Sequence, residues 1–239
     1  MKNAGKNQRF AFLFSAVEIV LWVLSVAVVI LSHIIFGGRG LLNLSASVIG
    51  VTSLILCAKG RPSGQALMIV FSVLYGIISF SFSYYGEMIT YLGMTMPMSV
   101  ASLVAWIKNP YDGNRSQVAV RRLGYLEYLM AAALTVAVTA VFYFILKAMG
   151  TTNIIPGTVS VATSFFAVYL TFRRSPYYAV AYAANDIVLV ILWIMAAVTD
   201  TSYISVAICF SVFLINDIYG FICWKKMEKS QMGDSARQK

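Results

Sequence analysis

The stretch that decides the fold is Tyr177–Trp224, which reads YYAVAYAANDIVLVILWIMAAV, then TDTS, then YISVAICFSVFLINDIYGFICW. Two almost entirely apolar runs flank a short polar turn, and each run contains an Asn-Asp pair. A helix needs about 20 apolar residues to cross the hydrocarbon core of a bilayer. Strands of a membrane barrel would alternate apolar and polar residues, and these runs do not. The stretch therefore predicts two antiparallel membrane-spanning helices.

The same pattern extends through the chain and predicts an all-α polytopic membrane protein. Of its 239 residues, 60% are hydrophobic and 11% are charged, against about 25% charged in soluble domains. This composition excludes both a soluble globular protein and a disordered chain. Since no segment between the apolar runs could form a further domain, we expect residues 1–239 to form one transmembrane domain. The eight predicted spans are Ala11–Phe36, Leu41–Ala58, Ala66–Tyr84, Met88–Ile107, Leu126–Met149, Ile155–Phe172, Tyr177–Val198 and Tyr203–Trp224.

The basic residues predict how the spans are oriented. With eight spans, both termini lie on one side, and that side receives all but two of the 18 lysines and arginines. The exceptions are Arg39 and Lys147. The positive-inside rule then predicts cytoplasmic termini. Orientation accounts for the net charge of +9, so we expect membrane lipid around the chain and no nucleic-acid partner. The connector from Lys108 to Tyr125 is expected to be a solvated loop.

No motif indicates an enzyme, a cofactor or a metal site. The three cysteines, Cys57, Cys209 and Cys223, lie in apolar runs, and His33 is the single histidine of the sequence. The chain has no glycine-rich phosphate loop and no HExxH or GxSxG motif. We therefore expect no catalytic residue and no bound cofactor.

Two local patterns occur once in each half of the chain and indicate an internal duplication. A basic turn that ends in proline occurs at Lys59–Pro62 and again at Arg173–Pro176. A Trp followed by lysine ends the fourth span at Trp106 and the eighth at Trp224. Each half holds four spans, so the repeats run parallel, and parallel repeats place a substrate site between them. The alternative is that these are ordinary basic turns and interfacial tryptophans.

Polar residues inside the spans predict the site. Charged groups in a bilayer are costly and face the protein interior. Glu18, Asn185, Asp186, Asn216 and Asp217 should lie about 10–14 Å from the inner boundary, given the helical rise. Helical spacing places Trp193 on the same face as Asn185, and Trp224 on the same face as Asn216. The corresponding face of the first half carries Met98 and Trp106, with Ser99 beside them, and is less polar. The candidate substrate-binding residues are Asn185, Asp186, Trp193, Asn216, Asp217, Tyr219, Trp224, Trp106, Met98, Ser99 and Glu18.

Several candidates have a structural alternative. Asn185 and Asn216 could hold helices together through amide hydrogen bonds. Trp106 and Trp224 stand beside lysines, where anchoring at the membrane interface is the more common role. Glu87 and other polar residues near the outer boundary are expected to be solvated, together with Tyr84, Tyr85 and Asp200.

Four segments carry a resemblance to a known family. They are Tyr85–Tyr91 (YGEMITY), Pro97–Pro110, Asn185–Trp193 (NDIVLVILW) and Asn216–Trp224 (NDIYGFICW). The chain from Leu41 to Lys226 resembles the PnuC vitamin transporters in their Gram-positive form, a family similar to the SWEET sugar transporters. The resemblance implies two parallel three-helix repeats, at 41–107 and 155–224. A linker helix at 126–149 joins them, and 11–36 is an extra N-terminal helix.

The resemblance also implies a function. It points to uptake of nicotinamide riboside, a ribosylated heteroaromatic vitamin, through a bacterial cell membrane. Transport would be facilitated diffusion without ion coupling, followed by trapping through phosphorylation in the cytoplasm. Nicotinamide riboside has a cationic pyridinium ring, which fits the carboxylates of Asp186 and Asp217. Thiamine is cationic as well, so charge does not distinguish the two substrates. A carrier for thiamine or deoxynucleosides, and a membrane scaffold or receptor that transports nothing, remain alternatives. A homo-oligomer is possible.

Overall fold

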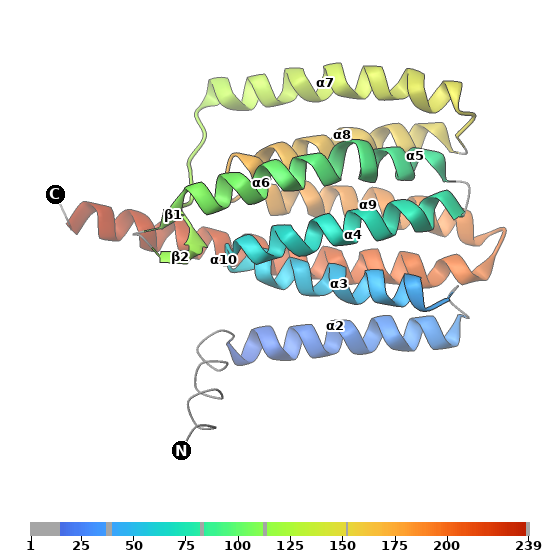
Figure 1. Cartoon of the computed structure of the whole chain (residues 1–239), viewed down its shortest axis with the longest axis horizontal. Helices are drawn as coiled ribbons and strands as arrows, with labels where there is room; N and C mark the ends of the chain where they lie inside the picture. The colour runs from blue at the N-terminus through green and yellow to red at the C-terminus, as the bar shows by residue number, and fades with distance from the viewer. Residues whose placement is uncertain (1–14, 37–39, 82–83, 112–113, 152, 238–239) are drawn as a thin grey trace.

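A computed structural model of the chain describes residues 15–36, 40–81, 84–111, 114–151 and 153–237, without the side chains of 114, 115 and 234–237. Within these ranges, eight helices are long and apolar enough to cross a membrane. They lie side by side with α2 and α7 at opposite edges of the bundle (Figure 1). The elements are α2 (Ala16–Ile35), α3 (Gly40–Ala58), α4 (Pro62–Ser81), α5 (Tyr85–Ile89), η1 (Thr90–Thr95), α6 (Met96–Lys108), β1 (Pro110–Tyr111), β2 (Asn114–Val118), α7 (Tyr125–Ala148), α8 (Ile154–Phe172), α9 (Tyr178–Ala197), η2 (Thr201–Tyr203) and α10 (Ile204–Arg237).

The helices form two three-helix bundles. In the first, α4 packs against α3 and α6, and in the second α9 packs against α8 and α10. The third helix of each bundle also packs against the first helix of the other, as α6 against α8 and α10 against α3. Of the remaining helices, α7 packs against α8, and α2 packs against α3 and α10. The architecture is therefore that of two parallel repeats, a linker helix and an additional N-terminal helix.

The turn inside each repeat has the same geometry. Gly60 and Arg174 occupy corresponding positions two residues before Pro62 and Pro176, and their φ angles are +65° and +61°. Glycine tolerates this left-handed conformation, whereas arginine is strained in it. In both turns this residue donates its backbone N–H to a carbonyl three residues earlier, that of Cys57 or Thr171. A proline then starts the next helix, or the turn before it, where no N–H donor is needed.

The connector between the two halves is not the solvated loop that its polar sequence predicts. It forms a short antiparallel hairpin from β1 and β2, and Val118 is fully buried. Its backbone N–H groups donate to the two repeated turns: Val118 to the carbonyl of Gly60, and Arg121 to that of Arg174. Because buried backbone groups must be hydrogen-bonded, these contacts hold the connector against both repeats.

Several helix boundaries differ from the predicted spans. Helix α4 begins at Pro62 rather than Ala66, and α10 continues beyond Trp224 to Arg237. The fourth span is interrupted by the π-helical segment η1, whereas the sequence predicts one regular helix. Such segments are frequent at functional sites. Residues 11–14 of the first predicted span, the turn 37–39 and the pair 112–113 lie outside the described residues.

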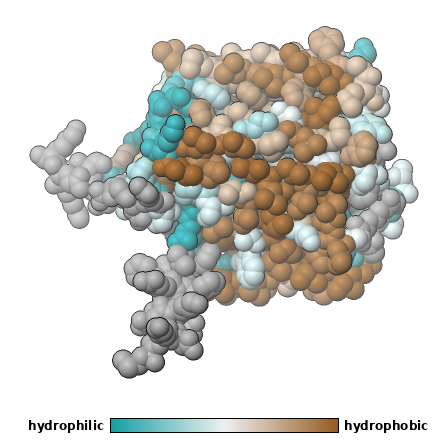
Figure 2. Space-filling view, viewed as in Figure 1, coloured by the Kyte–Doolittle hydropathy of each residue, from teal (hydrophilic) through white to brown (hydrophobic). Residues whose placement is uncertain are grey.

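The surface has one basic end. Hydrophilic residues gather at the end of the molecule from which α10 projects, and apolar residues cover much of the rest of this face (Figure 2). We call this end the basic end. The described turns, connector and helix end that form it carry Lys59, Arg61, Lys108, Arg121, Arg122, Arg173, Arg174, Lys225, Lys226 and Lys229. Lys147 lies at the opposite end of α7.

Candidate functional site

A small cavity lies between the two bundles and contains the carboxyl groups that the sequence singles out. Helix α9 contributes Asn185 and Asp186, and α10 contributes Asp217. The cavity volume is about 20 Å³, which is room for one water molecule. The remaining lining residues are mostly apolar or aromatic and come from both repeats: Leu54, Met68, Phe71, Tyr91, Thr95, Ser164, Tyr182, Phe210 and Phe213.

Asp186 and Asp217 face each other across this cavity. Both residues are 4% exposed, and their carboxyl groups are close enough to interact with each other. Among the described residues, Oδ2 of Asp186 has no hydrogen-bond partner. A buried carboxyl oxygen without a donor is costly unless a ligand, ion or water supplies one. The pair is therefore suited to receive a cation or a hydroxyl donor.

Asn185 is held in place by the hydroxyl groups of α8. Its Oδ1 accepts from Thr163 Oγ1 at 2.8 Å and from Ser164 Oγ at 2.9 Å, and Ser160 Oγ lies at 3.5 Å. Three hydroxyls on one turn of helix thus define the orientation of a single amide. This arrangement joins α8 to α9 and also fixes a polar group in the cavity wall.

Asn216 is next to Asp217 in sequence but points elsewhere. Its Nδ2 donates to Ser25 Oγ of α2 at 3.0 Å and to the carbonyl of Val212 at 2.8 Å. It is not among the residues that line the cavity. These contacts are those of an amide that holds helices together, the structural alternative to substrate binding for this residue.

Glu18 lies at the basic end and not at the depth of the cavity. It is in the first turn of α2, where it forms a capping box with Ser15. Its carboxylate pairs with Lys59 Nζ at 2.7 Å and accepts from Tyr219 Oη at 3.4 Å. The predicted depth is wrong because it counts from residue 11, whereas α2 begins at Ala16. Glu18 and Tyr219 are thus placed together, outside the cavity.

Trp106 and Trp224 are fully buried, so interfacial anchoring is the wrong interpretation of both. Trp106 Nε1 donates to the carbonyl of Thr171 at 3.0 Å, and Trp224 Nε1 donates to that of Cys57 at 2.8 Å. Each bond joins the third helix of one bundle to the first helix of the other. The two rings contact each other in the buried cluster near the basic end and do not line the cavity.

Trp193 belongs to an aromatic layer towards the opposite end. Its Nε1 donates to Tyr75 Oη at 2.7 Å, and its ring contacts those of Tyr84 and Tyr203. From the first repeat, Ser99 is buried and Met98 is partly buried, but neither lines the cavity. The π-helical segment supplies Tyr91 and Thr95 instead.

One residue that sequence reasoning assigned to solvent is buried beside the site. Glu87 is 2% exposed, and its Oε2 has no partner among the described residues. Its carboxyl group lies near Ser160, one of the hydroxyls around Asn185. Tyr84 is buried as well, at 8% exposure. The helical spacing from Glu87 to Tyr91 was the available signal, because residues four apart share a face.

The charged groups of the site do not form a metal centre. Among the residues that the structure describes, no group of three or more His, Cys, Asp or Glu side chains is placed to hold a metal ion. The cavity therefore offers a carboxyl pair, an oriented amide and aromatic faces, which is the chemistry of an organic ligand site.

Comparisons with known proteins agree on one family. The model of the nicotinamide mononucleotide transporter family matches residues 40–226. A nicotinamide riboside transporter PnuC from Neisseria mucosa is 25% identical over 192 residues, covering 79% of this chain and 73% of the relative. The protein of the same name from Haemophilus influenzae is 24% identical over 191 residues, covering 79% and 80%.

A solved structure shares the fold. The crystal structure of the vitamin B3 transporter PnuC superposes with a TM-score of 0.80 at 22% identity, and the match covers 91% of this chain and 94% of that one. The family match spans more than three quarters of the chain and includes both bundles and the carboxyl pair. The chain therefore belongs to the nicotinamide mononucleotide transporter family, and it is a membrane transporter rather than an enzyme.

Proposed function

We propose that this transporter carries nicotinamide riboside into the cell by facilitated diffusion and binds it at the Asp186–Asp217 pair. The observation that carries the proposal is this carboxyl pair, buried in an aromatic-lined cavity between the two bundles. The names of the two curated relatives support the choice of substrate. Because the chain belongs to a transporter family, we set aside the alternative of a scaffold or receptor that transports nothing.

The chemistry of the substrate matches the groups in the cavity. Nicotinamide riboside has a cationic pyridinium ring, a carboxamide and ribose hydroxyls. A carboxyl pair favours the cation, and the faces of Tyr91 and Tyr182 add a cation–π contribution. The amide of Asn185 and the free oxygen of Asp186 are suited to hydroxyl or amide groups of the ligand.

Substrate entry requires the two bundles to separate, since the cavity now holds little more than one water molecule. Buried aromatic clusters lie on both sides of it. The Trp106–Trp224 pair is on the basic-end side, and Trp193 with Tyr75 and Tyr84 is on the other. Opening one cluster at a time would give alternating access around the same site.

We place the basic end in the cytoplasm because most of the lysines and arginines lie there. Both termini would then be cytoplasmic. Phosphorylation of the substrate in the cytoplasm would keep the inward gradient, so uptake would need no ion gradient. Thiamine remains the second candidate, because it is a heteroaromatic cation that the same carboxyl pair would accept. The carboxyl pair gives no comparable support to neutral deoxynucleosides.

Uptake into proteoliposomes tests this function. We expect saturable uptake of labelled nicotinamide riboside that protonophores and sodium ionophores leave unchanged. Excess unlabelled nicotinamide riboside should abolish it, and thiamine should compete only weakly. Stronger competition by thiamine would transfer the assignment to thiamine, and loss of uptake with the proton gradient would contradict facilitated diffusion.

A further inference from the structure

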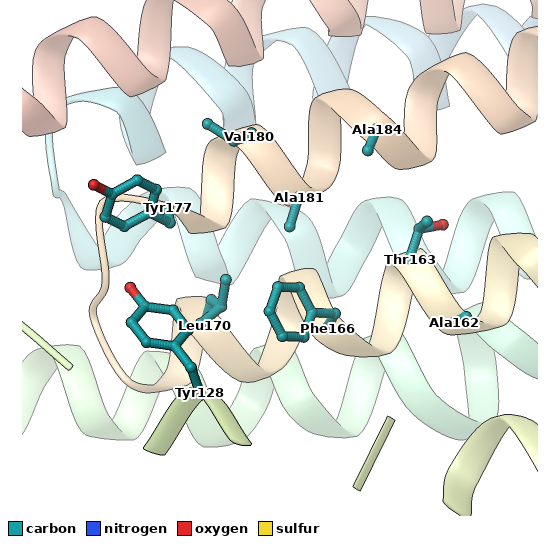
Figure 3. Close-up of a pocket in the computed structure, with 9 residues that line it drawn as sticks. All are labelled: Tyr128, Ala162, Thr163, Phe166, Leu170, Tyr177, Val180, Ala181 and Ala184. Carbon is teal, nitrogen blue, oxygen red and sulfur yellow. The ribbon is translucent and has the colours of Figure 1, made fainter. Parts of the chain in front are cut away.

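An apolar groove lies along the side of the second bundle, away from the central cavity. It runs along α8 and α9, with Tyr128 of the first turn of α7 at one end, and its volume is about 620 Å³ (Figure 3). Several of its side chains are small, which leaves the space open, and Tyr177 and Val180 are exposed. The lining residues are Tyr128, Ala162, Thr163, Phe166, Leu170, Tyr177, Val180, Ala181 and Ala184.

The groove leads to a second recess at the basic end. This recess has a volume of about 350 Å³ and shares Tyr128 and Tyr177 with the groove. Its polar lining consists of two cationic side chains, Arg122 and Lys225, of Glu228, which bonds to both, and of Ser175. One continuous surface therefore changes from apolar, at membrane depth, to polar and cationic, where α9 and α10 reach the end of the bundle.

Cations outnumber carboxylates around this recess. Glu228 pairs with both Arg122 and Lys225, and Glu127 pairs with both Arg121 and Arg173. Arg174 adds a further positive charge beside them. Partial burial, together with repulsion from Arg121 and Arg173, lowers the pKa of the Arg174 guanidinium. The excess positive charge is available to an external anion, since each carboxylate is already shared between two cations.

We propose that an anionic phospholipid binds at this surface, with its phosphate between Arg122 and Lys225 and one acyl chain in the groove beside α7. A groove open to the hydrocarbon region is filled by lipid, since water there would be unfavourable. Basic recesses between membrane helices select anionic headgroups. The side chain of Arg122 is 65% exposed and that of Lys225 32%, so both can reach a headgroup.

The site lies close to the transport machinery. Thr163 lines the groove and also donates to Asn185 Oδ1 at 2.8 Å. The acyl chain would therefore contact the outer side of the wall that orients Asn185. It would also lie beside the first turn of the linker helix α7, which is itself little buried.

Native mass spectrometry of the purified protein tests the proposal, with dioleoyl-phosphatidylglycerol as the anionic probe and dioleoyl-phosphatidylcholine as the neutral one. We expect the wild-type chain to retain phosphatidylglycerol roughly tenfold more strongly, given two cations at the recess. The double variant Arg122→Gln/Lys225→Gln should lose this preference. Its matched control is Lys108→Gln/Lys226→Gln, which removes two exposed cations of the same end and should keep it.

The groove is tested separately by filling it. Ala181→Phe should weaken binding of both lipids at the site, whereas Ala140→Phe fills a neighbouring groove without basic lining residues and should leave the preference intact. Equal retention of the two lipids by the wild-type chain would overturn the proposal. So would undiminished binding of phosphatidylglycerol by Ala181→Phe, or equal losses of preference in the two charge variants.

Discussion

Trp106 and Trp224 contact each other with ring centroids 5.3 Å apart, and each donates its indole N–H to a carbonyl of the opposite bundle. The two acceptors, Thr171 and Cys57, occupy corresponding positions of the two repeats, three residues before the left-handed residue of each turn. The contact is therefore reciprocal. It joins the bundles on the basic-end side of the carboxyl pair, where the proposed transport cycle would open the protein for the substrate to leave.

Replacing either tryptophan by phenylalanine keeps a six-membered aromatic ring but removes the pyrrole part of the indole, with its N–H and hydrogen bond. We expect Trp106→Phe and Trp224→Phe to lower the free energy of unfolding by similar amounts, about 1–2 kcal/mol, because each leaves a buried carbonyl with one donor fewer. Thermal unfolding in detergent measures this. Trp22→Phe is the control, since Trp22 is partly exposed and bonds to Thr52 of the neighbouring helix. An equal loss in Trp22→Phe would contradict a special role for the buried pair.

Glu87→Gln tests whether the buried acid positions the site. Its carboxyl lies beside Ser160, which in turn lies beside Asn185, so we expect a several-fold increase in KM for uptake with little change in the maximal rate. Ser160→Ala should have the same effect. Thr158→Ala removes a hydroxyl from the same helix that bonds only to its own backbone, and it should leave KM unchanged. If Glu87→Gln lowered only the amount of folded protein, its role would be structural.

Glycine is expected to be the favoured residue at the left-handed position of both repeated turns, so substitutions at Gly60 and Arg174 should have opposite effects on stability. Gly60→Ala should destabilise the protein by about 1–2 kcal/mol, because it places a Cβ at φ +65° and only 3.3 Å from Val118. Arg174→Gly should be more stable than Arg174→Ala by about 1 kcal/mol, because both lose the side chain but only glycine relieves the backbone. Thermal unfolding compares the three variants. If Arg174→Ala were as stable as Arg174→Gly, the turn would not be strained.

The orientation of the chain is open to a labelling test. Lys226→Cys should react in intact cells only with membrane-permeant maleimides, whereas Lys147→Cys should react with impermeant ones. The unmodified chain is the control for Cys57, Cys209 and Cys223, which are buried or partly buried. The reverse pattern would place the basic end outside the cell.

The sequence alone predicted the eight-span fold, the parallel repeats and the meeting of Asn185, Asp186 and Asp217. Apolar runs and paired motifs can be recognised locally in the sequence. A polar residue in a membrane-spanning helix usually faces the protein interior, because exposing it to lipid is costly. These predictions needed no knowledge of how the helices pack.

Most of the errors concern residues near the ends of spans. A Trp beside a lysine has the same pattern whether it lies at the interface or in a packed core, so Trp106 and Trp224 were misassigned. Glu87 precedes a π-helical segment that no periodicity indicated. The contacts of Asn216 and Glu18 depend on where α2 packs, because Asn216 bonds to Ser25 of α2 and Glu18 belongs to α2. A sequence pattern does not show which helices neighbour a peripheral helix. The connector is polar yet ordered, because its hydrogen bonds come from turns distant in sequence.

In the proposed transport cycle, nicotinamide riboside binds between Asp186 and Asp217. Equilibrium binding of nicotinamide riboside to purified protein tests it most directly, with Asp186→Asn and Asp217→Asn compared with the wild-type chain. Asp200→Asn is the control, since Asp200 caps a short turn outside the cavity and asparagine also caps. We predict that both cavity variants stay folded and bind at least tenfold more weakly, while Asp200→Asn binds as the wild type does. Wild-type affinity in both cavity variants would show that nicotinamide riboside does not bind at this carboxyl pair.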